Sequence, residues 1–530
     1  MPRFYIENFG CRATQADGAA LERQFLERGL ERAAAARDAE IVVLNTCTVT
    51  DGADKDARAS IRRLQRVNPD CRILVTGCYA QRAPEELAAL PGVTWVVGNS
   101  HKHQAAQIAT AASSNFTPGS SSPNSGFVPL GHLSQVRPSG GHAENQAANV
   151  IVGDIFAHTE LLAAPVFEAA NERTRPNLKV QDGCDNRCSF CVIPYVRGQS
   201  RSLASERVIT EVRTLVEVGY REVVISGINL GRWGRDLEVV GRQSVVVSEQ
   251  NLVSSVIPST KQPKSNSERL TTNDQRLVHL IRAILEQTSL GKLRISSVEP
   301  MDWSDELIKL VSTSPRIAKH AHVPMQSGSD AVLRRMHRKY RPWHYREKIL
   351  RIRAAMPTAA IGADVVVGFP GETESEFDET RRTIEELPFT YLHVFTYSAR
   401  PGTPAAELPA QVPVAVARER NRVLRELASR KKAAFMRSLV GTTVEAITLQ
   451  SGGRDFTEAL TDNYLKMKIP GHHEANQWID VKVEGVDGEM LVGTPVGAPG
   501  LPLANLDQLV TQECTPAKKR IDRQPFAGLR

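Results

Sequence analysis

Short apolar runs alternate with longer stretches of helical periodicity along most of this chain. In residues 1–112 the apolar runs are Phe4–Phe9, Ile41–Asn45 and Arg72–Thr76, and the helical stretches are Gly18–Arg28, Ala53–Val67 and Pro84–Leu90. Alternation of strands and helices is typical of an α/β domain whose parallel strands are covered by helices. We therefore predict an N-terminal doubly wound parallel sheet over residues 1–112.

The same alternation returns on a larger scale in residues 170–412. Six apolar runs are predicted strands: Leu178–Gln181, Val223–Ser226, Leu293–Ser297, His320–Pro324, Ala363–Val367 and Tyr391–Thr396. Helical periodicity lies between them, for example in Ser205–Val218 and Arg276–Gln287. A complete barrel of this kind has eight strands, so we predict a partial (β/α)6 barrel. A polar stretch at residues 238–275 interrupts the pattern and is predicted to be a surface insertion.

The pattern changes again after the predicted (β/α)6 barrel. Residues 413–440 form a long helical segment rich in arginine and lysine. Short apolar runs punctuated by glycine then predict a small antiparallel β-barrel over residues 441–508, with strands at Thr442–Leu449, Asp455–Thr461, Trp478–Val483 and Met490–Thr494. Residues 113–169 are assigned to a polar linker or insertion, and residues 509–530 to a basic tail.

Length, charge and hydrophobicity limit the number of domains, the partners and the cellular location that we expect. A chain of 530 residues is too long for one hydrophobic core, in agreement with several domains. The net charge of +7 permits an acidic partner. No apolar run approaches the roughly 20 residues of a membrane helix, and the first residues lack the apolar core of a signal peptide. We therefore expect a cytoplasmic protein without a membrane partner, in which clustered cysteines bind metal more often than they form disulfides.

Three cysteines lie within eight residues, at Cys184, Cys188 and Cys191. Structural zinc sites normally take four protein ligands, and iron–sulfur clusters usually take four cysteines. A cluster held by three thiolates keeps one iron free for a ligand that is not protein. The alternatives at this point are a zinc site with a distant fourth ligand and a group of redox-active thiols.

Three further cysteines are dispersed in the sequence, but each has the same position relative to a predicted strand. Cys11, Cys47 and Cys78 each follow the carboxyl end of a predicted strand. In an open parallel sheet these ends line one edge, where ligands bind, so the three thiols are predicted to converge on a second cluster. The alternative is buried, unreactive cysteine. Cys71 precedes its strand and Cys514 lies in the tail, and neither is predicted to be a ligand.

Several motifs, in order, give the chain a specific resemblance. They are Asn8–Cys11, Asn45–Thr50, Thr76–Gln81, Cys184–Cys191 with Ile193–Gly198, Ser226–Gly231, Gln326–Asp330 and Val367–Thr373. With these motifs the chain resembles the radical S-adenosylmethionine methylthiotransferase family, over residues 1–112 and about 170–505. The motifs Ile295–Pro300, Met336–Tyr340 and His393–Pro404 look most like the MtaB-type members.

The resemblance implies two [4Fe–4S] clusters and S-adenosylmethionine as cofactors. Cys184, Cys188 and Cys191 would hold the cluster that cleaves S-adenosylmethionine to a 5′-deoxyadenosyl radical. Cys11, Cys47 and Cys78 would hold an auxiliary cluster that carries the sulfur to be transferred. An electron donor and a sulfur source are further implied partners.

Other positions are weaker candidates for contacts with the cofactor. Gly227, Gln326 and Ser327 follow predicted strands of the core, although Gln326 and Ser327 also fit a polar turn that caps the next helix. The loop Gly368–Glu372 resembles one near the adenine of the cofactor. Arg197 and Arg201 are interpreted either as contacts for phosphate or the cofactor carboxylate, or as solvated surface arginines.

The implied reaction is methylthiolation of C2 of N6-threonylcarbamoyladenosine next to the anticodon of tRNA. Sister groups act on isopentenyladenosine in tRNA or on an aspartate of a ribosomal protein, and both remain alternatives. The C-terminal barrel resembles a TRAM domain, which with the basic helix before it would bind tRNA phosphates, and the implied partner of the enzyme is the anticodon stem-loop. An alternative of another class is a non-catalytic iron–sulfur protein that transfers electrons.

Overall fold

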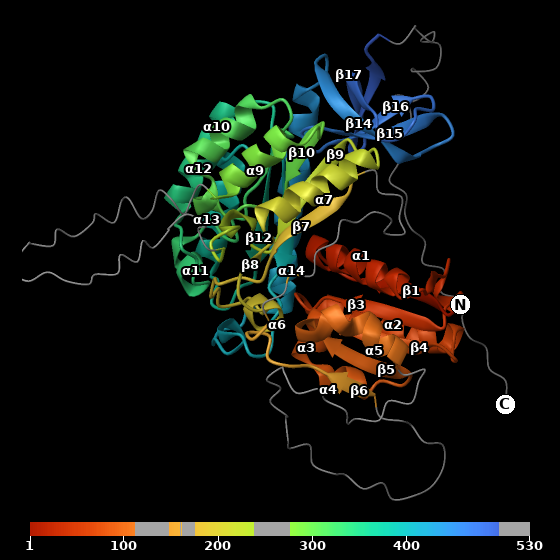
Figure 1. The fold of residues 1–530 in the computed structure, drawn as a ribbon. Helices are drawn as coiled ribbons and strands as arrows, with labels where there is room; N and C mark the ends of the chain where they lie inside the picture. The colour runs from red at the N-terminus through yellow and green to blue at the C-terminus, as the bar shows by residue number, and fades with distance from the viewer. Residues whose placement is uncertain (112–147, 159–160, 162–174, 238–275, 498–530) are drawn as a thin grey trace, which may run out of the picture.

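Residues 1–111, 148–158, 161, 175–237 and 276–497 are described by the computed structural model. Most of the predicted linker, the insertion at 238–275 and the tail with Cys514 lie outside these residues. Figure 1 shows an N-terminal α/β domain, a central barrel of strands and helices, and a small C-terminal β-barrel. The architecture predicted from the sequence is confirmed.

The N-terminal domain is a parallel sheet with strand order β2-β1-β3-β4-β5-β6. Its strands are β1 (Arg3–Asn8), β2 (Glu31–Arg32), β3 (Ile41–Thr46), β4 (Arg72–Gly77), β5 (Val93–Gly98) and β6 (Asn149–Ile151). Its helices are α1 (Arg12–Glu27), α2 (Asp51–Val67), α3 (Cys78–Arg82), α4 (Pro84–Ala88) and α5 (Ala105–Ala111). Separate apolar clusters cover the two faces of the sheet, as in a doubly wound fold. The edge strand β6 belongs to residues that we assigned to the linker.

The core is a partial barrel of six parallel strands with one short antiparallel strand at its edge. The strands are β7 (Asn177–Asp182), β8 (Arg201–Ser202), β9 (Glu222–Gly227), β10 (Lys292–Ile295), β11 (His320–His322), β12 (Ala360–Val367) and β13 (Tyr391–Thr396). Isolated bridges, among them Ser297 to His322, join β10 to β11 and so connect two smaller sheets. The helices are α6 (Ile193–Arg197), α7 (Ser205–Glu217), α9 (Arg276–Gln287), α10 (Asp305–Thr313), α11 (Asp330–Arg335), α12 (Pro342–Ala355) and α13 (Glu374–Glu386).

The two faces of the core strands differ in chemistry. One face carries residues such as Ala321, Val323 and Val365, which are fully buried in a single apolar cluster with the helices. Because side chains alternate along a strand, the other face points into the barrel. There the strands carry polar residues, including Lys179, Ser226, Arg294, His322 and Asp364. A barrel interior of this kind is suited to polar ligands rather than to a packed core.

A long helix connects the core to the C-terminal barrel. Helix α14 (Val414–Ser438) packs against β13, and the closed barrel that follows has the strand order β14-β15-β16-β18-β17. Its strands are β14 (Thr443–Gly452), β15 (Phe456–Thr461), β16 (Lys466–Pro470), β17 (Trp478–Asp487) and β18 (Met490–Pro495). The sequence pattern predicted four of these strands and missed β16. Among the described helices, none combines the length and the apolar character that crossing a membrane requires.

The C-terminal barrel is attached to the amino ends of the core strands. Lys292, the first residue of β10, forms an ion pair of 2.6 Å with Glu445 of β14. The guanidinium of Arg294 donates to the carbonyl oxygen of Asp462, and the amide of Asn463 donates to the carbonyl oxygen of Thr358, just before β12. The carboxyl ends of the core strands are therefore left for other elements.

Candidate functional site

The edge of the N-terminal sheet brings Cys11, Cys47 and Cys78 together. The parallel register aligns Asn8 of β1 with Asn45 of β3, so Cys11 and Cys47 leave neighbouring strands at the same edge. Cys78 begins α3 directly after β4. The thiol of Cys47 donates a hydrogen bond to the sulfur of Cys11, and Cys78 is close enough to interact electrostatically with Cys47.

Two glycines make this close approach possible. Gly10 has a φ of +92°, and a Cβ atom there would lie 2.4 Å from the Cβ atom of Cys47. Gly77 has a φ of +104°, and its Cβ atom would lie 2.3 Å from the carbonyl oxygen of Thr46. Both positions therefore need a residue without a side chain.

The sulfur atoms of this trio have polar partners that suit bound metal. The thiol–thiol hydrogen bond lowers the pKa of Cys11 and raises that of Cys47. The side-chain amide of Asn99 lies 3.5 Å from the sulfur of Cys78, to which it donates, and also donates to the carbonyl oxygen of Val196 in the core. Hydrogen bonds to cysteine sulfur are one means by which proteins tune iron–sulfur clusters.

Cys184, Cys188 and Cys191 lie on the loop between β7 and α6. The backbone amide of Asn186 and the side-chain amide of Asn229 donate to the sulfur of Cys184, at 3.4 Å and 3.7 Å. The guanidinium of Arg338 donates to the sulfur of Cys188 at 3.2 Å. Burial raises the pKa of Cys184 and raises that of Cys191 to about 12, because an apolar environment disfavours the thiolate.

The loops that carry the two trios pack against each other. Cys78 forms one apolar cluster with Val192 and Val196, and Val192 directly follows Cys191. Helix α3, which begins at Cys78, also packs against α6. The two sets of thiols therefore belong to adjoining walls of the interface between the N-terminal domain and the core.

A buried network of charges fixes this interface. Arg197 is only 2% exposed and forms ion pairs of 2.9 Å with Asp17 of α1 and with Asp182 of β7. Lys179 of β7 contacts both carboxylates, and Lys102 contacts Asp17 at 2.9 Å. Burial opposes ionisation of Asp17, but Arg197, Lys102 and Lys179 outweigh it and hold its pKa well below the usual range.

This network corrects our interpretation of Arg197. It is neither a solvated surface arginine nor free to bind phosphate, because both of its charged partners are protein carboxylates. Arg201 is half-buried, and its guanidinium donates to the carbonyl oxygen of His158. It lines a cavity beside the network, so an anion contact for Arg201 stays a prediction.

The three weaker cofactor candidates lie at the carboxyl ends of core strands. Gly227 ends β9, and a Cβ atom there would lie 2.8 Å from the side-chain oxygen of Gln181. Gln326 has a φ of 62° and forms a bridge to Val365. Ser327 is buried, and its hydroxyl interacts with Thr380 and accepts from the amide of Ser329. The hydroxyl of Ser327 is thus engaged in the turn before α11, whose N-cap residue Ser329 makes no side-chain capping bond. A contact between Ser327 and the cofactor stays a prediction.

The loop Gly368–Glu372 reaches the cysteine loop through aromatic contact. Phe369 is fully buried, and its ring lies edge-on to that of Phe190, with 6.4 Å between the ring centroids. In the sequence, Phe190 lies between Cys188 and Cys191. Glu372 anchors the loop, because it accepts from the amide of Gly368 and forms an ion pair with Arg420 of α14. Its role beside an adenine stays a prediction.

A pocket beside Cys188 contains residues to which the sequence analysis gave no role. Arg338, the donor to Cys188, also forms an ion pair with Glu299, and its guanidinium lies 5.0 Å from the ring centroid of Tyr340. Burial raises the pKa of Glu299. In the sequence, the motifs Ile295–Pro300 and Met336–Tyr340 indicate only the family resemblance. They meet beside Cys188 because the barrel brings their segments together.

Comparison with known proteins identifies the class of the chain. Residues 3–98 match the family model described as "Uncharacterized protein family UPF0004", and residues 267–384 match the model of the "Radical SAM superfamily". The chain is thus a radical S-adenosylmethionine enzyme with an additional N-terminal domain. The family of such enzymes implies a [4Fe–4S] cluster and S-adenosylmethionine.

Relatives of similar length define the family. The chain is 34% identical to "Threonylcarbamoyladenosine tRNA methylthiotransferase MtaB" of Bacillus subtilis (strain 168), covering 88% of this chain and 90% of the relative. It is 32% identical to the protein of the same name from Aquifex aeolicus (strain VF5), covering 90% and 99%. It is 30% identical to "tRNA-2-methylthio-N(6)-dimethylallyladenosine synthase" of Erythrobacter litoralis (strain HTCC2594), covering 85% and 87%. The chain belongs to the radical S-adenosylmethionine methylthiotransferase family.

Similarity to solved structures is more distant. The radical S-adenosylmethionine methyltransferase TsrM from Kitasatospora setae, with tryptophan and a cofactor analogue bound, is 13% identical with a TM-score of 0.49, covering 85% of this chain and 79% of that one.

Proposed function

We propose that this enzyme adds a methylthio group to C2 of N6-threonylcarbamoyladenosine beside the anticodon of tRNA. Relatives whose names state this activity align with about nine-tenths of the chain. Relatives named for dimethylallyladenosine align at similar identity, so isopentenyladenosine in tRNA is the second candidate substrate. Family membership argues against the non-catalytic iron–sulfur protein.

The observation that carries the proposal is the contact between the segments that hold the two cysteine trios. Cys184, Cys188 and Cys191 would hold the cluster that binds S-adenosylmethionine, and Cys11, Cys47 and Cys78 would hold the auxiliary cluster. When bound, these groups supply the radical that activates an unreactive C–H bond and the sulfur that replaces the hydrogen. Cys78 packs against Val192, so the donor and the radical source would lie in adjoining walls of one site.

The chain's own residues orient these groups and shield them from water. Arg338 and Asn229 donate to cysteine sulfurs of the core loop, and Asn99 donates to Cys78. Such outer contacts are expected to fix the orientation of metal ligands. The proposed contacts for S-adenosylmethionine are Gln326, which follows β11, and the backbone of Gly227, which ends β9.

The C-terminal barrel is proposed to bind the tRNA backbone. Helix α14 contributes less than its sequence suggests, because Arg420 is buried against Glu372 and Arg422 pairs with Glu419 and Glu426. Exposed Arg418, Arg425 and Arg430 remain available for phosphate contacts that weaken with salt. Removal of residues 441–530 should abolish tRNA binding, whereas retained turnover of a protein substrate would favour the ribosomal-protein alternative.

Mass spectrometry of tRNA nucleosides tests the substrate. Cells that lack this protein should lose the methylthio group from threonylcarbamoyladenosine and keep it on isopentenyladenosine. Restoration by the wild-type gene, but not by one carrying Cys47→Ala, is the matched control. Loss of the methylthio group from isopentenyladenosine alone would replace the proposed substrate with the second candidate.

A further inference from the structure

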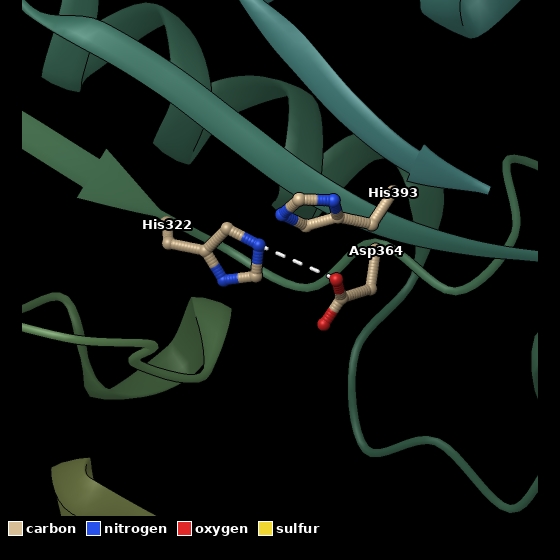
Figure 2. Close-up of side chains that lie close together, drawn as sticks. All are labelled: His322, Asp364 and His393. Atoms are coloured by element: carbon tan, nitrogen blue, oxygen red, sulfur yellow. Dashed lines mark ion pairs between the residues drawn. The ribbon is translucent and has the colours of Figure 1, made fainter. Parts of the chain in front are cut away.

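Two imidazoles and a carboxylate meet inside the core barrel. They belong to His322 of β11, Asp364 of β12 and His393 of β13, and Figure 2 shows their side chains directed toward one another. One potential ligand atom from each residue lies within 4.8 Å of the other two. None of the three residues belongs to either cysteine trio.

The strand register fixes this arrangement. Asp364 pairs with His393 across β12 and β13, and His322 pairs with Gly362, two residues before Asp364 on the same face of β12. Ala321 and Val323, on either side of His322, are fully buried against the helices. Since neighbouring side chains alternate, His322 must point into the barrel. Three side chains on adjacent strands are more precisely held than side chains on loops.

Tyr391 supports both imidazoles from one side. Its ring centroid lies 6.0 Å from that of His322 and 5.3 Å from that of His393. Its hydroxyl is 2.7 Å from Nε2 of His320, one layer closer to the amino ends of the strands. Gly362 makes room for this ring, because a Cβ atom there would lie 2.0 Å from Cζ of Tyr391. The site is thus closed toward the amino ends and faces the barrel interior.

The buried imidazole of His322 has an unmet polar atom. The residue is 9% exposed, and its Nε2 makes no hydrogen bond among the described residues. This Nε2 atom lies 3.3 Å from Oδ1 of Asp364, with which it would form an ion pair if the ring were protonated. Bonds of 2.0–2.2 Å in a tetrahedral zinc site separate neighbouring ligand atoms by about 3.4 Å. The spacing between His322 and Asp364 therefore matches an edge of such a site.

The second imidazole is also suited to a metal. The ring centroid of His393 lies 5.7 Å from that of His322, so both imidazoles border the same space inside the barrel. Two histidines and one carboxylate form a ligand set that leaves positions open for a non-protein ligand, as in catalytic zinc and non-haem iron sites.

We propose that His322, Asp364 and His393 bind one divalent transition-metal ion of the zinc or ferrous class. The open coordination positions would face the barrel interior and accept an oxygen or nitrogen donor from a ligand there. The site does not depend on the proposed tRNA substrate, and it is separate from the iron held by the cysteines.

Metal analysis of the full-length chain, purified without a histidine tag and carrying its clusters, tests the proposal. After exposure to micromolar Zn²⁺ and dialysis, the wild type should retain one zinc per chain in addition to its iron. Asp364→Asn and His393→Ala should lose this zinc and keep their iron. His344→Ala removes an exposed imidazole from α12 and should retain the zinc.

Two results would overturn the proposal. One is equal zinc retention by the wild type and both variants, because the ion would then lie elsewhere. The other is a wild type without retained zinc whose Asp364→Asn and His393→Ala variants lose tRNA modification, since the side chains would then contact the substrate directly. His393 is exposed to the barrel interior, so its variant is expected to fold even if that of Asp364 does not.

Discussion

The two cysteine trios each gather three thiols, but they differ in how the chain brings those thiols together. Cys184, Cys188 and Cys191 come from one loop, whereas Cys11, Cys47 and Cys78 come from three strand ends of a parallel sheet. The first trio is set by spacing along the chain, and the second exists only when β1, β3 and β4 are in register. A change in the sheet should therefore damage one trio and leave the other functional.

The substitution Gly10→Ala is predicted to have the largest effect, and it should damage the dispersed trio while the Cys184 loop stays intact. Its Cβ atom would displace Cys47, so the chain should lose the iron of the auxiliary site and all methylthio product. Cleavage of S-adenosylmethionine should continue, because the loop of Cys184 is untouched. Iron analysis and product assays measure the two outcomes.

Gly29→Ala is the matched control for Gly10→Ala. Gly29 also has a positive φ, of +76°, but its Cβ atom would meet nothing within 4 Å. It should cost only the backbone strain of roughly 1–2 kcal/mol and keep all iron. If both variants lost iron equally, backbone strain rather than contact with Cys47 would be responsible.

Arg197→Met is predicted to separate the walls that carry the two trios. It removes one of the two cations that Asp17 and Asp182 share, the other being Lys179, and removal of one member of a buried ion pair costs about 3–5 kcal/mol. Denaturant unfolding measures the loss. Arg351→Met, in an exposed pair with Asp305, should cost at most about 1 kcal/mol. Similar losses for the two variants would mean that the network does not hold the domains together.

The pH dependence of the same network is predicted to be the smallest effect. The pKa of Asp17 is lower in the folded protein than its unfolded value of about 3.9. The contribution of ionised Asp17 to the unfolding free energy is therefore fully present above the unfolded pKa. It declines as the pH falls toward and through the pKa of the folded protein. The difference in unfolding free energy between the wild type and Asp17→Asn should be constant from pH 6 to 8 and shrink below about pH 4. A difference that grows on acidification would contradict the assigned charges.

The sequence predicted regular elements better than their ends. All six parallel core strands and the helix Arg276–Gln287 were predicted, because their apolar periodicity is set by one continuous core. Helix α1 begins at Arg12 and not at Gly18, since its first turns bury polar Thr14 and Asp17 and only small apolar residues, which give a weak periodic signal. Strand β16 was missed because only Met467 and Ile469 are buried in its five residues.

Parts of the site depend on contacts that no local pattern encodes. Arg197 meets Asp17, which lies 180 residues earlier, so its burial could not be inferred from neighbouring residues. The group of His322, Asp364 and His393 had a detectable signal, namely polar residues at alternate positions of otherwise apolar strands. That signal gives the face of each strand but not the distances between strands.

The division of labour between the trios is tested most directly by comparing Cys47→Ala with Cys184→Ala. Each purified variant would be given S-adenosylmethionine, reductant and tRNA, and both cofactor cleavage and methylthio nucleoside would be measured. We predict that Cys47→Ala still cleaves S-adenosylmethionine to 5′-deoxyadenosine but makes no methylthio product, and that Cys184→Ala does neither. Loss of cleavage in Cys47→Ala despite intact iron at the Cys184 loop would contradict separate roles for the two sites.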